Sequence, residues 1–287
     1  MKKINLKALQ DISDLPKLLL SENPKIRWKN HQSVSREFEI EKWGSLLSLS
    51  KKENISVELL EKKMHENESY KPFLYQDDLY IDYPINISNF FLKKSIKLLK
   101  KIYAEHNCRS VMEIGAGYGR LLIPFVNELS NEDYEGVVGA DYTFSSGQIL
   151  DNLSKNLKYN IFTTQMDVSG KNQVRHSLQN IKMKRPIIFT CQTIMYVPFL
   201  EESFFNLMKT WSDAIFCNFE PTYPKVSLDK LKTLQRKYIE VNDYNRNLEK
   251  FLNKKEKKGV IKIISSYNSE ISENVFLPLK NIVWKFN

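Results

Sequence analysis

The 287-residue sequence has few cysteines, few glycines and no long apolar run, and each shortage excludes a class of protein. Its three cysteines are odd in number and form no C-x-x-C pair, which argues against a disulfide framework and against a zinc site. No stretch approaches the roughly 18 uncharged apolar residues that a membrane span requires. Charged side chains interrupt the apolar residues of the first 20 positions, so we expect an amphipathic helix there and no signal peptide. A reducing, cytoplasmic location is the resulting expectation.

The charge balance is basic, with 43 lysines and arginines against 34 acidic residues and a net charge of +9. Such a balance can indicate nucleic acid or a phosphorylated partner, but lysines also solvate the outer faces of helices. The densest basic run, residues 254–258, lies between a helical pattern and Gly259, where the end of a helix favours cations. The run is therefore explained without a ligand, and nucleic acid is not the expected partner.

Two regions with different patterns divide the chain. Up to about residue 108, segments 57–65 and 87–106 carry apolar side chains at helical spacing, and the tyrosine-rich residues 70–83 fit neither a helix nor a strand. From residue 109, short apolar runs alternate with helical patterns, which indicates a parallel sheet. We expect strands at 110–114, 136–140, 160–165, 186–191, 214–219, 260–265 and 279–286, and helices at 120–129, 146–157, 173–181, 200–211 and 227–254.

These patterns predict an α/β fold in two parts. Residues 1–108 form a mainly helical N-terminal cap, and residues 109–287 form a domain with a seven-stranded, mostly parallel sheet and helices on both faces. The last two strands have no helix between them, so we expect an antiparallel final strand.

The segment SVMEIGAGYGRLL at 110–122 holds three of the nine glycines and indicates a strand, a glycine loop and a helix. Gly115 allows a sharp turn, Gly117 lets a ligand approach the backbone, and Gly119 lets the helix pack closely. The G-x-G-x-G spacing differs from the G-x-G-x-x-G of dinucleotide enzymes. A tight turn without any ligand is the alternative interpretation.

Three acidic residues stand at the ends of the first three expected strands. Glu113 lies in the first, where a buried charge is costly without a partner. Asp141 ends the second, a position that can accept hydrogen bonds from two ribose hydroxyls. Asp167 follows the third between Met166 and Val168, so it could receive an adenine amino group while its apolar neighbours hold the ring. Each acid alone would pass for a cap or a surface residue, but the three together are a specific combination.

The segment VMEIGAGYG at 111–119 resembles the first motif of class I S-adenosylmethionine-dependent methyltransferases, its acid included. Asp141 and Asp167 match the second and third acidic positions of that family. The segment IIFTCQTIMYVPFLEE at 187–202 resembles the fourth motif of its small-molecule branch. The resemblance covers residues 110–287, the terminal hairpin included, and leaves the N-terminal third outside. It implies a Rossmann-like fold for residues 109–287.

The resemblance also implies S-adenosylmethionine as the cofactor. Glu113 and Gln192 would then serve its methionine part, Asp141 its ribose and Asp167 its adenine. The full expected set is Glu113, Gly115, Ala116, Gly117, Tyr118, Gly119, Asp141, Tyr142, Met166, Asp167, Val168 and Gln192. No cluster of metal ligands is visible, so no metal is expected.

Methyl transfer is an in-line displacement in which an enzyme supplies mainly proximity and orientation, with a base where the acceptor is a hydroxyl. The candidates near the acceptor are Tyr196 in the fourth motif, Glu220 at the end of the fifth strand, and His31 if the N-terminal segment folds over the site. Packing under a helix is the alternative role for Tyr196, and a loop charge or helix cap is the alternative for Glu220.

We expect the N-terminal cap to cover the acceptor pocket, with residues 70–83 as a tyrosine-rich wall that suits sugars. The chain also resembles sugar O-methyltransferases of bacterial surface-glycan clusters, through its E-I-G-x-G-Y-G loop and the asparagine-rich residues 242–253. The expected activity is therefore O-methylation of a sugar or glycan precursor. A small-molecule or glycan acceptor is the expected partner, and a homodimer is left open.

Three alternatives compete with this interpretation. A nicotinamide enzyme would need the longer glycine spacing and a Tyr-x-x-x-Lys pair, which the sequence lacks at the right place. A methyltransferase acting on RNA or protein suits the basic charge, but no Pro-Pro-aromatic signature for a flipped base is present, and no proline precedes Cys191. A non-catalytic regulator would bind the donor without turnover.

Overall fold

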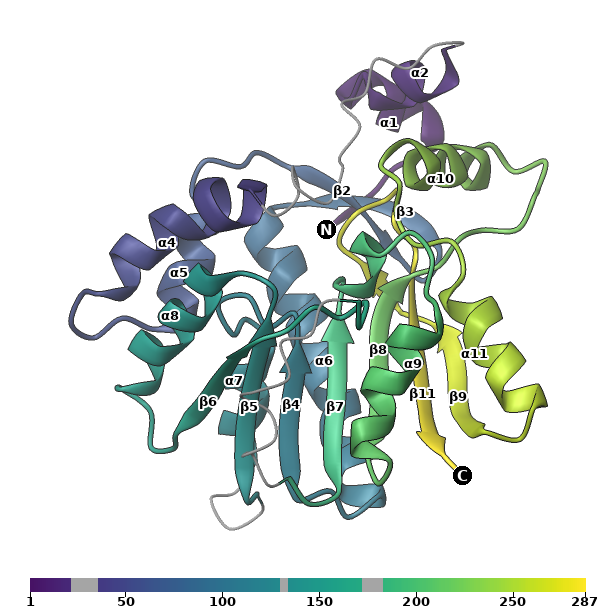
Figure 1. The fold of residues 1–287 in the computed structure, drawn as a ribbon. Helices are drawn as coiled ribbons and strands as arrows, with labels where there is room; N and C mark the ends of the chain where they lie inside the picture. The colour runs from purple at the N-terminus through teal and green to yellow at the C-terminus, as the bar shows by residue number, and fades with distance from the viewer. Residues whose placement is uncertain (22–35, 130–133, 172–182) are drawn as a thin grey trace.

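A computed structural model describes residues 1–21, 36–129, 134–171 and 183–287. The parallel strands of its large sheet are β4 (Ser110–Ile114), β5 (Gly136–Asp141), β6 (Ile161–Gln165), β7 (Pro186–Cys191) and β8 (Ile215–Pro221). With β9 (Ile261–Asn268) and β11 (Leu279–Phe286) the sheet has the order β6-β5-β4-β7-β8-β11-β9 (Figure 1). Strand β11 runs antiparallel to both β8 and β9, so the predicted seven-stranded, mostly parallel sheet with an antiparallel final strand is confirmed.

The strand order places a switch of direction beside β4. From β4 the chain moves outward to β5 and β6, and it then returns to β7 on the other side of β4. After β4 and after β7 the chain therefore continues toward opposite faces of the sheet. A crevice opens between the two loops at the carboxyl ends of the strands, where open α/β sheets bind ligands.

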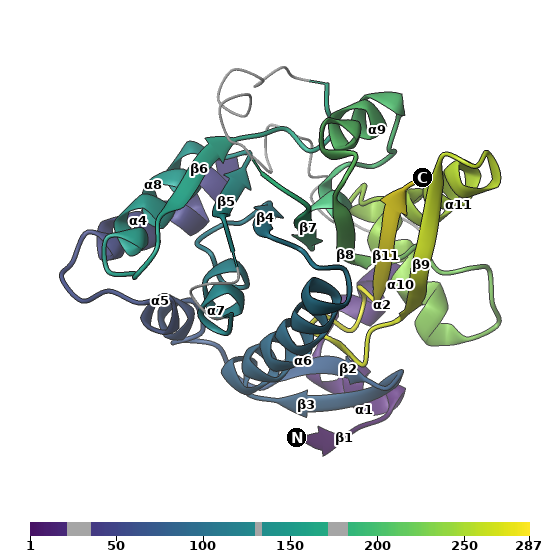
Figure 2. The ribbon, with the colours of Figure 1, turned by 90° about the horizontal axis from the view of Figure 1, so that it is seen from below.

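Successive side chains along the strands pack alternately into two hydrophobic layers, one on each face of the sheet. Val111 and Val137 belong to the layer covered by α6 (Pro84–Glu105), α7 (Leu122–Asn127) and α8 (Phe144–Ser154). Their neighbours Met112 and Val138 belong to the layer covered by α9 (Glu202–Met208) and α11 (Leu248–Lys257). Figure 2 shows these two groups of helices on opposite faces of the sheet, as predicted. The helix expected at 173–181 lies outside the described residues.

The N-terminal region holds both helices and strands. Besides α6, its described helical elements are α1 (Leu6–Ile12), α2 (Leu15–Leu20), η1 (Glu37–Lys42), α4 (Trp43–Ser50) and α5 (Val57–Met64). A second sheet of order β1-β3-β2-β10 joins β1 (Lys2–Lys3), β2 (Lys71–Tyr75) and β3 (Asp78–Asp82) to β10 (Ile271–Ser272) from the C-terminal half. Helix α10 (Lys230–Val241) packs against α2 above this sheet.

The tyrosine-rich stretch forms the β2–β3 hairpin, so the expectation of a mainly helical region missed this small sheet. The two turn residues, Gln76 and Asp77, have φ angles of 51° and 64°. Two successive positive φ angles are typical of a tight hairpin turn, which usually has glycine or asparagine at these positions. Gln-Asp gives no such signal, and the hairpin therefore escaped the sequence analysis.

The hydrophobic core crosses the predicted boundary at residues 108–109. Trp43, Leu46 and Leu60 from the N-terminal region are buried in the same cluster as Val111 of β4 and Leu150 of α8. Residues 1–108 and 109–287 therefore share one hydrophobic core. Their division into a cap and a domain stays a prediction. Among the described helices, none is long and apolar enough to cross a membrane.

Candidate active site

The glycine loop leaves β4 in a conformation that requires glycine. Gly115 has a φ of +78°, a region that side chains rarely adopt. A Cβ atom built on Gly115 would lie 2.0 Å from Oγ1 of Thr193, on the loop that follows β7. The absence of a side chain therefore lets the two loops at the switch point approach each other.

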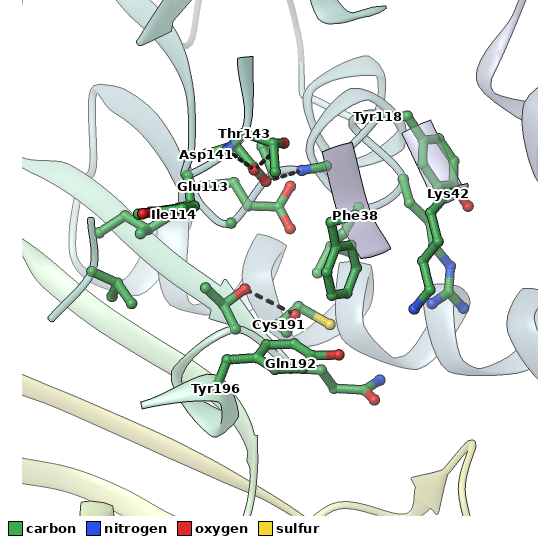
Figure 3. Close-up of a pocket in the computed structure, with 18 of the residues that line it drawn as sticks. Phe38, Lys42, Glu113, Ile114, Tyr118, Asp141, Thr143, Cys191, Gln192 and Tyr196 are labelled. Atoms are coloured by element: carbon green, nitrogen blue, oxygen red, sulfur yellow. Dashed lines mark hydrogen bonds between the residues drawn. The ribbon is translucent and has the colours of Figure 1, made fainter. Parts of the chain in front are cut away.

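A cavity of about 560 Å³ opens where these loops meet, within the roughly 300–1,000 Å³ typical of ligand pockets (Figure 3). It is lined by all of the predicted donor-binding residues except Gly119, namely Glu113, Gly115, Ala116, Gly117, Tyr118, Asp141, Tyr142, Met166, Asp167, Val168 and Gln192. A Cβ atom on Gly119 would instead lie 2.7 Å from Leu150, in agreement with the close helix packing expected for this glycine. Strand ends that are distant in sequence thus contribute to one site.

Asp141 is tied to both loops around the cavity. Its Oδ2 accepts a hydrogen bond from the backbone N–H of Gly117 at 2.8 Å. Its Oδ1 accepts from the N–H of Thr143 at 2.8 Å and from the Thr143 hydroxyl at 2.7 Å. Burial raises the pKa of Asp141 above its ordinary value, although these hydrogen bonds act in the opposite direction. A carboxylate offers about four lone pairs, so one acceptor position, on Oδ2, remains for a ligand's hydroxyl.

Glu113 is buried, with 2% of its surface exposed, and its carboxylate points into the cavity in Figure 3. Its Oε2 atom has no hydrogen-bond partner among the described residues. Burial, together with the nearby Asp141, raises the pKa of Glu113 well above its ordinary value. A buried carboxylate oxygen without a partner is costly unless a ligand supplies a donor or a positive charge.

Two further parts of the cavity lining differ in character. Asp167 lies between the buried Met166 and Val168, and its Oδ1 accepts a hydrogen bond from the N–H of Ser169 at 2.9 Å. Gln192 has a positive φ of 53° and donates its side-chain N–H to Glu273 at 3.2 Å. The first part offers an acid between apolar side chains, and the second offers a fixed amide.

The three candidates near the acceptor have different outcomes. Tyr196 lines the cavity, and burial raises the pKa of its hydroxyl. Glu220 does not belong to the lining, because it accepts hydrogen bonds from the backbone N–H groups of the turn η3 (Ile194–Tyr196) and the residue before it. Burial raises the pKa of Glu220 to about 7 despite these bonds. The structure thus favours the cap alternative for Glu220, and His31 lies outside the described residues.

Residues that the sequence analysis did not single out complete the cavity wall. They come from η1, α4 and α5 of the N-terminal region and are Phe38, Lys42, Trp43, Glu61, Met64 and His65. The Trp43 ring lies 3.2 Å from where a Cβ atom of Gly117 would be, so it rests on the glycine loop. Glu39 accepts hydrogen bonds from the N–H groups of Phe144 and Ser145 at 2.9 and 3.0 Å and so caps α8. The residues 70–83 expected as the acceptor wall do not line the cavity.

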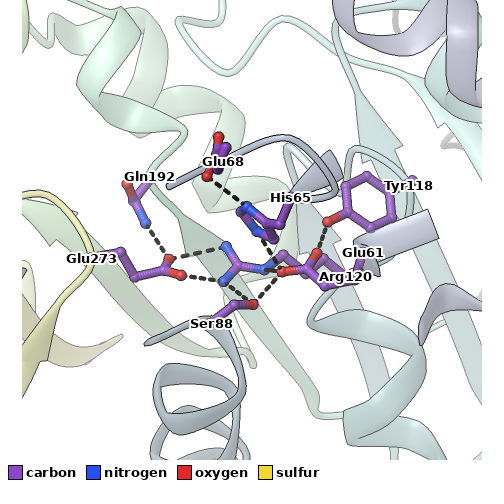
Figure 4. Close-up of polar contacts among 8 residues, drawn as sticks. All are labelled: Glu61, His65, Glu68, Ser88, Tyr118, Arg120, Gln192 and Glu273. Carbon is purple, nitrogen blue, oxygen red and sulfur yellow. Dashed lines mark hydrogen bonds and ion pairs between the residues drawn. The ribbon is translucent and has the colours of Figure 1, made fainter. Parts of the chain in front are cut away.

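A buried polar cluster connects the N-terminal region to the glycine loop (Figure 4). Glu61 accepts hydrogen bonds from Ser88 and Tyr118, lies 3.1 Å from Nε2 of His65 and forms an ion pair with Arg120 at 3.2 Å. Arg120 also forms a bidentate pair with Glu273. Burial acts to raise the pKa of Glu61, but His65, Arg120 and the hydroxyls lower it to about 2. Of the residues in Figure 4, Tyr118 and Gln192 were expected from the sequence, both as donor-binding residues.

No group of three or more histidine, cysteine, aspartate or glutamate side chains in the described part of the chain could hold a metal ion.

No protein-family model matches the sequence, and no curated protein matches it either. Solved structures match at the level of fold. The chain is similar to magnesium protoporphyrin IX methyltransferase from Synechocystis PCC 6803 with bound SAH, with a TM-score of 0.52 and 12% identity over 90% of this chain and 100% of that one. It is also similar to a SAM-dependent methyltransferase from Anabaena variabilis, with a TM-score of 0.52 and 10% identity over 93% of this chain and 100% of that one. The chain has the SAM-dependent methyltransferase fold. At identities this low, the likeness concerns the fold alone.

Proposed function

We propose that the protein transfers a methyl group from S-adenosylmethionine to a small-molecule acceptor. The observation that carries the proposal is the unpartnered carboxylate oxygen of Glu113, buried in a cavity that also contains the glycine loop and Asp141. A ligand with an ammonium group at one end and a ribose further along would satisfy both acids. The similar solved structures named above, one of which contains SAH, support the same choice.

Different residues of the cavity would bind different parts of the donor. Glu113 and Gln192 would hold its methionine part, and the remaining lone pair on Oδ2 of Asp141 would accept a ribose hydroxyl. Asp167 would receive the adenine amino group between Met166 and Val168. When bound, S-adenosylmethionine supplies a methyl group on a positively charged sulfur. The chain would contribute the fixed orientation of donor and acceptor.

The acceptor we propose is a sugar or glycan precursor, methylated on oxygen. Beyond the donor residues, the lining includes both aromatic and polar side chains, among them Phe38, Lys42, His65, Tyr196, Asn242, Asp243 and Tyr244. Aromatic faces pack on the apolar side of a sugar ring, while hydroxyl, amide and charged groups bond its hydroxyls. These residues, and not the tyrosines of residues 70–83, would contact a polyhydroxy acceptor.

Transfer of a labelled methyl group from S-adenosylmethionine into fractionated cell extract tests the proposal. The fractions are small metabolites, glycans, RNA and protein, and the Asp141→Ala variant serves as the blank. Label in the metabolite or glycan fraction that depends on Asp141 is the expected result. Label confined to RNA or protein would refute the small-molecule acceptor.

A second candidate, a methyltransferase acting on RNA, is favoured by one specific observation. A groove of about 720 Å³ next to the cavity is lined by six cations, Lys225, Arg246, Lys250, Lys254, Lys257 and Lys258. Glu249 is the acidic residue among the groove's described lining, and it pairs with Lys280. A basic groove suits a phosphate backbone, and RNA labelling that falls steeply with salt would support this candidate.

A further inference from the structure

His65 lines the same cavity as the glycine loop, although it comes from the end of α5. Its side chain is 19% exposed, and both ring nitrogens face carboxylates (Figure 4). Nε2 lies 3.1 Å from Oε1 of Glu61, and Nδ1 lies 2.9 Å from Oε2 of Glu68. An imidazole at the cavity wall with one ring nitrogen held by a fixed carboxylate has the arrangement that general-base catalysis requires.

The two carboxylates differ in how firmly they are held. The Glu61 side chain is 5% exposed and is fixed by Ser88, Tyr118 and Arg120. The Glu68 side chain is 46% exposed, and among the described residues its carboxylate is held by His65 alone. Nε2 therefore has a permanent partner, whereas the partner of Nδ1 can be exchanged for a ligand. Glu61 fixes the tautomer and the direction of the ring, as the carboxylate behind a catalytic histidine does.

We propose that His65 is the general base of the transfer reaction and that Glu61 is its positioning residue. This inference rests on the proposed methyl transfer and deepens it to acceptors that must lose a proton. An acceptor hydroxyl replaces Glu68 at Nδ1. The hydroxyl oxygen forms a bond to the methyl carbon while the carbon–sulfur bond breaks and its electron pair stays on sulfur. The hydroxyl proton moves to Nδ1 and passes to water after the product leaves, so the products are a methyl ether, neutral S-adenosylhomocysteine and a solvated proton.

The other titratable groups of the lining are less suited to the role. Burial raises the pKa of Tyr196, so its hydroxyl keeps its proton at neutral pH. Asp243 is paired with Arg246. Glu113 and Asp141 stand on the donor side of the cavity. The hydrogen bond to Glu61 raises the pKa of His65, and Glu68 adds to the rise, so its neutral form is a stronger base than a free histidine.

An NMR titration of the histidine side chains of the full-length protein, with S-adenosylhomocysteine present, gives a readout independent of turnover. The charged groups that face His65 are Glu61 and Glu68, with Arg120 behind Glu61 and Glu273 behind Arg120. We expect His65 to titrate above 6.5, and we expect Glu68→Gln to lower that titration. His106 is the matched control, because it too ends a helix, α6, but does not line the cavity.

The transfer assay uses labelled S-adenosylmethionine and the small-metabolite fraction of cell extract. His65→Gln should reduce the rate by about 100-fold or more, as for loss of a general base, while His106→Gln leaves it unchanged. The pH–rate profile of the wild type should rise above pH 6.5, and Glu68→Gln should move that rise to lower pH with activity retained. A merely structural role for His65 would not move the profile in this way.

The outcomes separate this inference from the proposed function. If the His65→Gln variant binds S-adenosylhomocysteine normally and transfers at the wild-type rate, the base assignment is wrong and methyl transfer stands. An unmoved pH profile in Glu68→Gln would overturn the assignment even if His65→Gln failed to fold. A wild type that binds no S-adenosylhomocysteine by calorimetry would overturn the proposed function itself.

Discussion

The backbone N–H of Gly117 donates a hydrogen bond to Oδ2 of Asp141 at 2.8 Å, which joins the loop after β4 to the end of β5. This carboxylate fixes the glycine loop and also offers its one remaining lone pair, on Oδ2, to the cavity. The same residue connects backbone geometry to ligand binding, so its replacement should affect both.

We expect Asp141→Ala to weaken S-adenosylmethionine binding by more than tenfold, about 1.4 kcal/mol, because the ribose hydroxyls lose their acceptor and the loop loses its anchor. Isothermal titration calorimetry of the two proteins measures the change. Asp11→Ala is the control, since Asp11 is exposed on α1 away from the cavity lining. Near-unchanged affinity in Asp141→Ala would refute the ribose assignment.

A pair of glycine variants tests the approach of the two loops. Gly115→Ala should lower the free energy of unfolding by roughly 2–4 kcal/mol and abolish donor binding, because its φ is positive and its new methyl would collide with Thr193. Gly136→Ala at the start of β5 should be close to neutral, since a Cβ there meets nothing within 4 Å. Urea unfolding of both variants supplies the comparison, and equal destabilisation would contradict the argument.

The sheet and the donor side of the cavity could be predicted from the sequence because both depend on local patterns. The strands expected at 110–114, 186–191 and 279–286 have those bounds in the structure, since continuous apolar runs mark buried strands. Parallel strands end at one edge of a sheet, so acids at strand ends necessarily converge there. Glu113, Asp141 and Asp167 were found in this way.

Apart from Tyr196, the cavity wall contributed by the N-terminal region and its neighbours could not be predicted, because its residues meet only through tertiary packing. Glu61 and His65 look like the polar face of a short helix, and nothing near them in sequence indicates that Tyr118 and Arg120 will lie against them. For Glu220, the sequence left two roles open. It stands at a strand end like the donor acids, but its lone pairs serve the turn after β7, which a strand pattern does not reveal.

Glu113→Gln should separate stability from binding. The raised pKa of Glu113 means that its charged form is disfavoured in the folded chain, so this residue's contribution to stability falls as the pH rises above the ordinary value of 4.5. A neutral amide removes that penalty, and we expect the melting temperature of the ligand-free protein at pH 8 to rise by about 2–4 °C. Affinity for S-adenosylmethionine should fall at the same time, because an amide does not neutralise an ammonium group. A variant that is less stable and binds normally would show that Glu113 is purely structural.

Trp43 is expected to link the N-terminal region to donor binding. Its ring packs on Gly117 and, at 5.6 Å between centroids, on Tyr118. Trp43→Ala should lower the free energy of unfolding by about 3–5 kcal/mol and also weaken donor binding, since the loop loses its cover. Trp211 of η4 (Lys209–Trp211), buried on the opposite face of the sheet, is the control. Trp211→Ala should lower the free energy of unfolding by a similar amount and leave the affinity of the folded protein for the donor unchanged. Equal losses of donor affinity in the two variants would show that Trp43 has no specific role in donor binding.

We expect Glu61 to contribute to the loss of the protein's stability at acid pH. Its pKa of about 2 in the folded chain lies below the ordinary 4.5, so it stabilises the fold fully above pH 4.5 and loses this effect as the pH falls toward 2. The difference corresponds to about 3 kcal/mol, and Glu61→Gln should be less stable than the wild type by an amount of this order at pH 7. The gap between the two proteins should then narrow below pH 4.5, as followed by urea unfolding at a series of pH values. Glu58→Gln, at an exposed position of the same helix, should show no such convergence, and a gap that stays constant down to pH 3 would mean that the buried cluster does not hold Glu61 ionised.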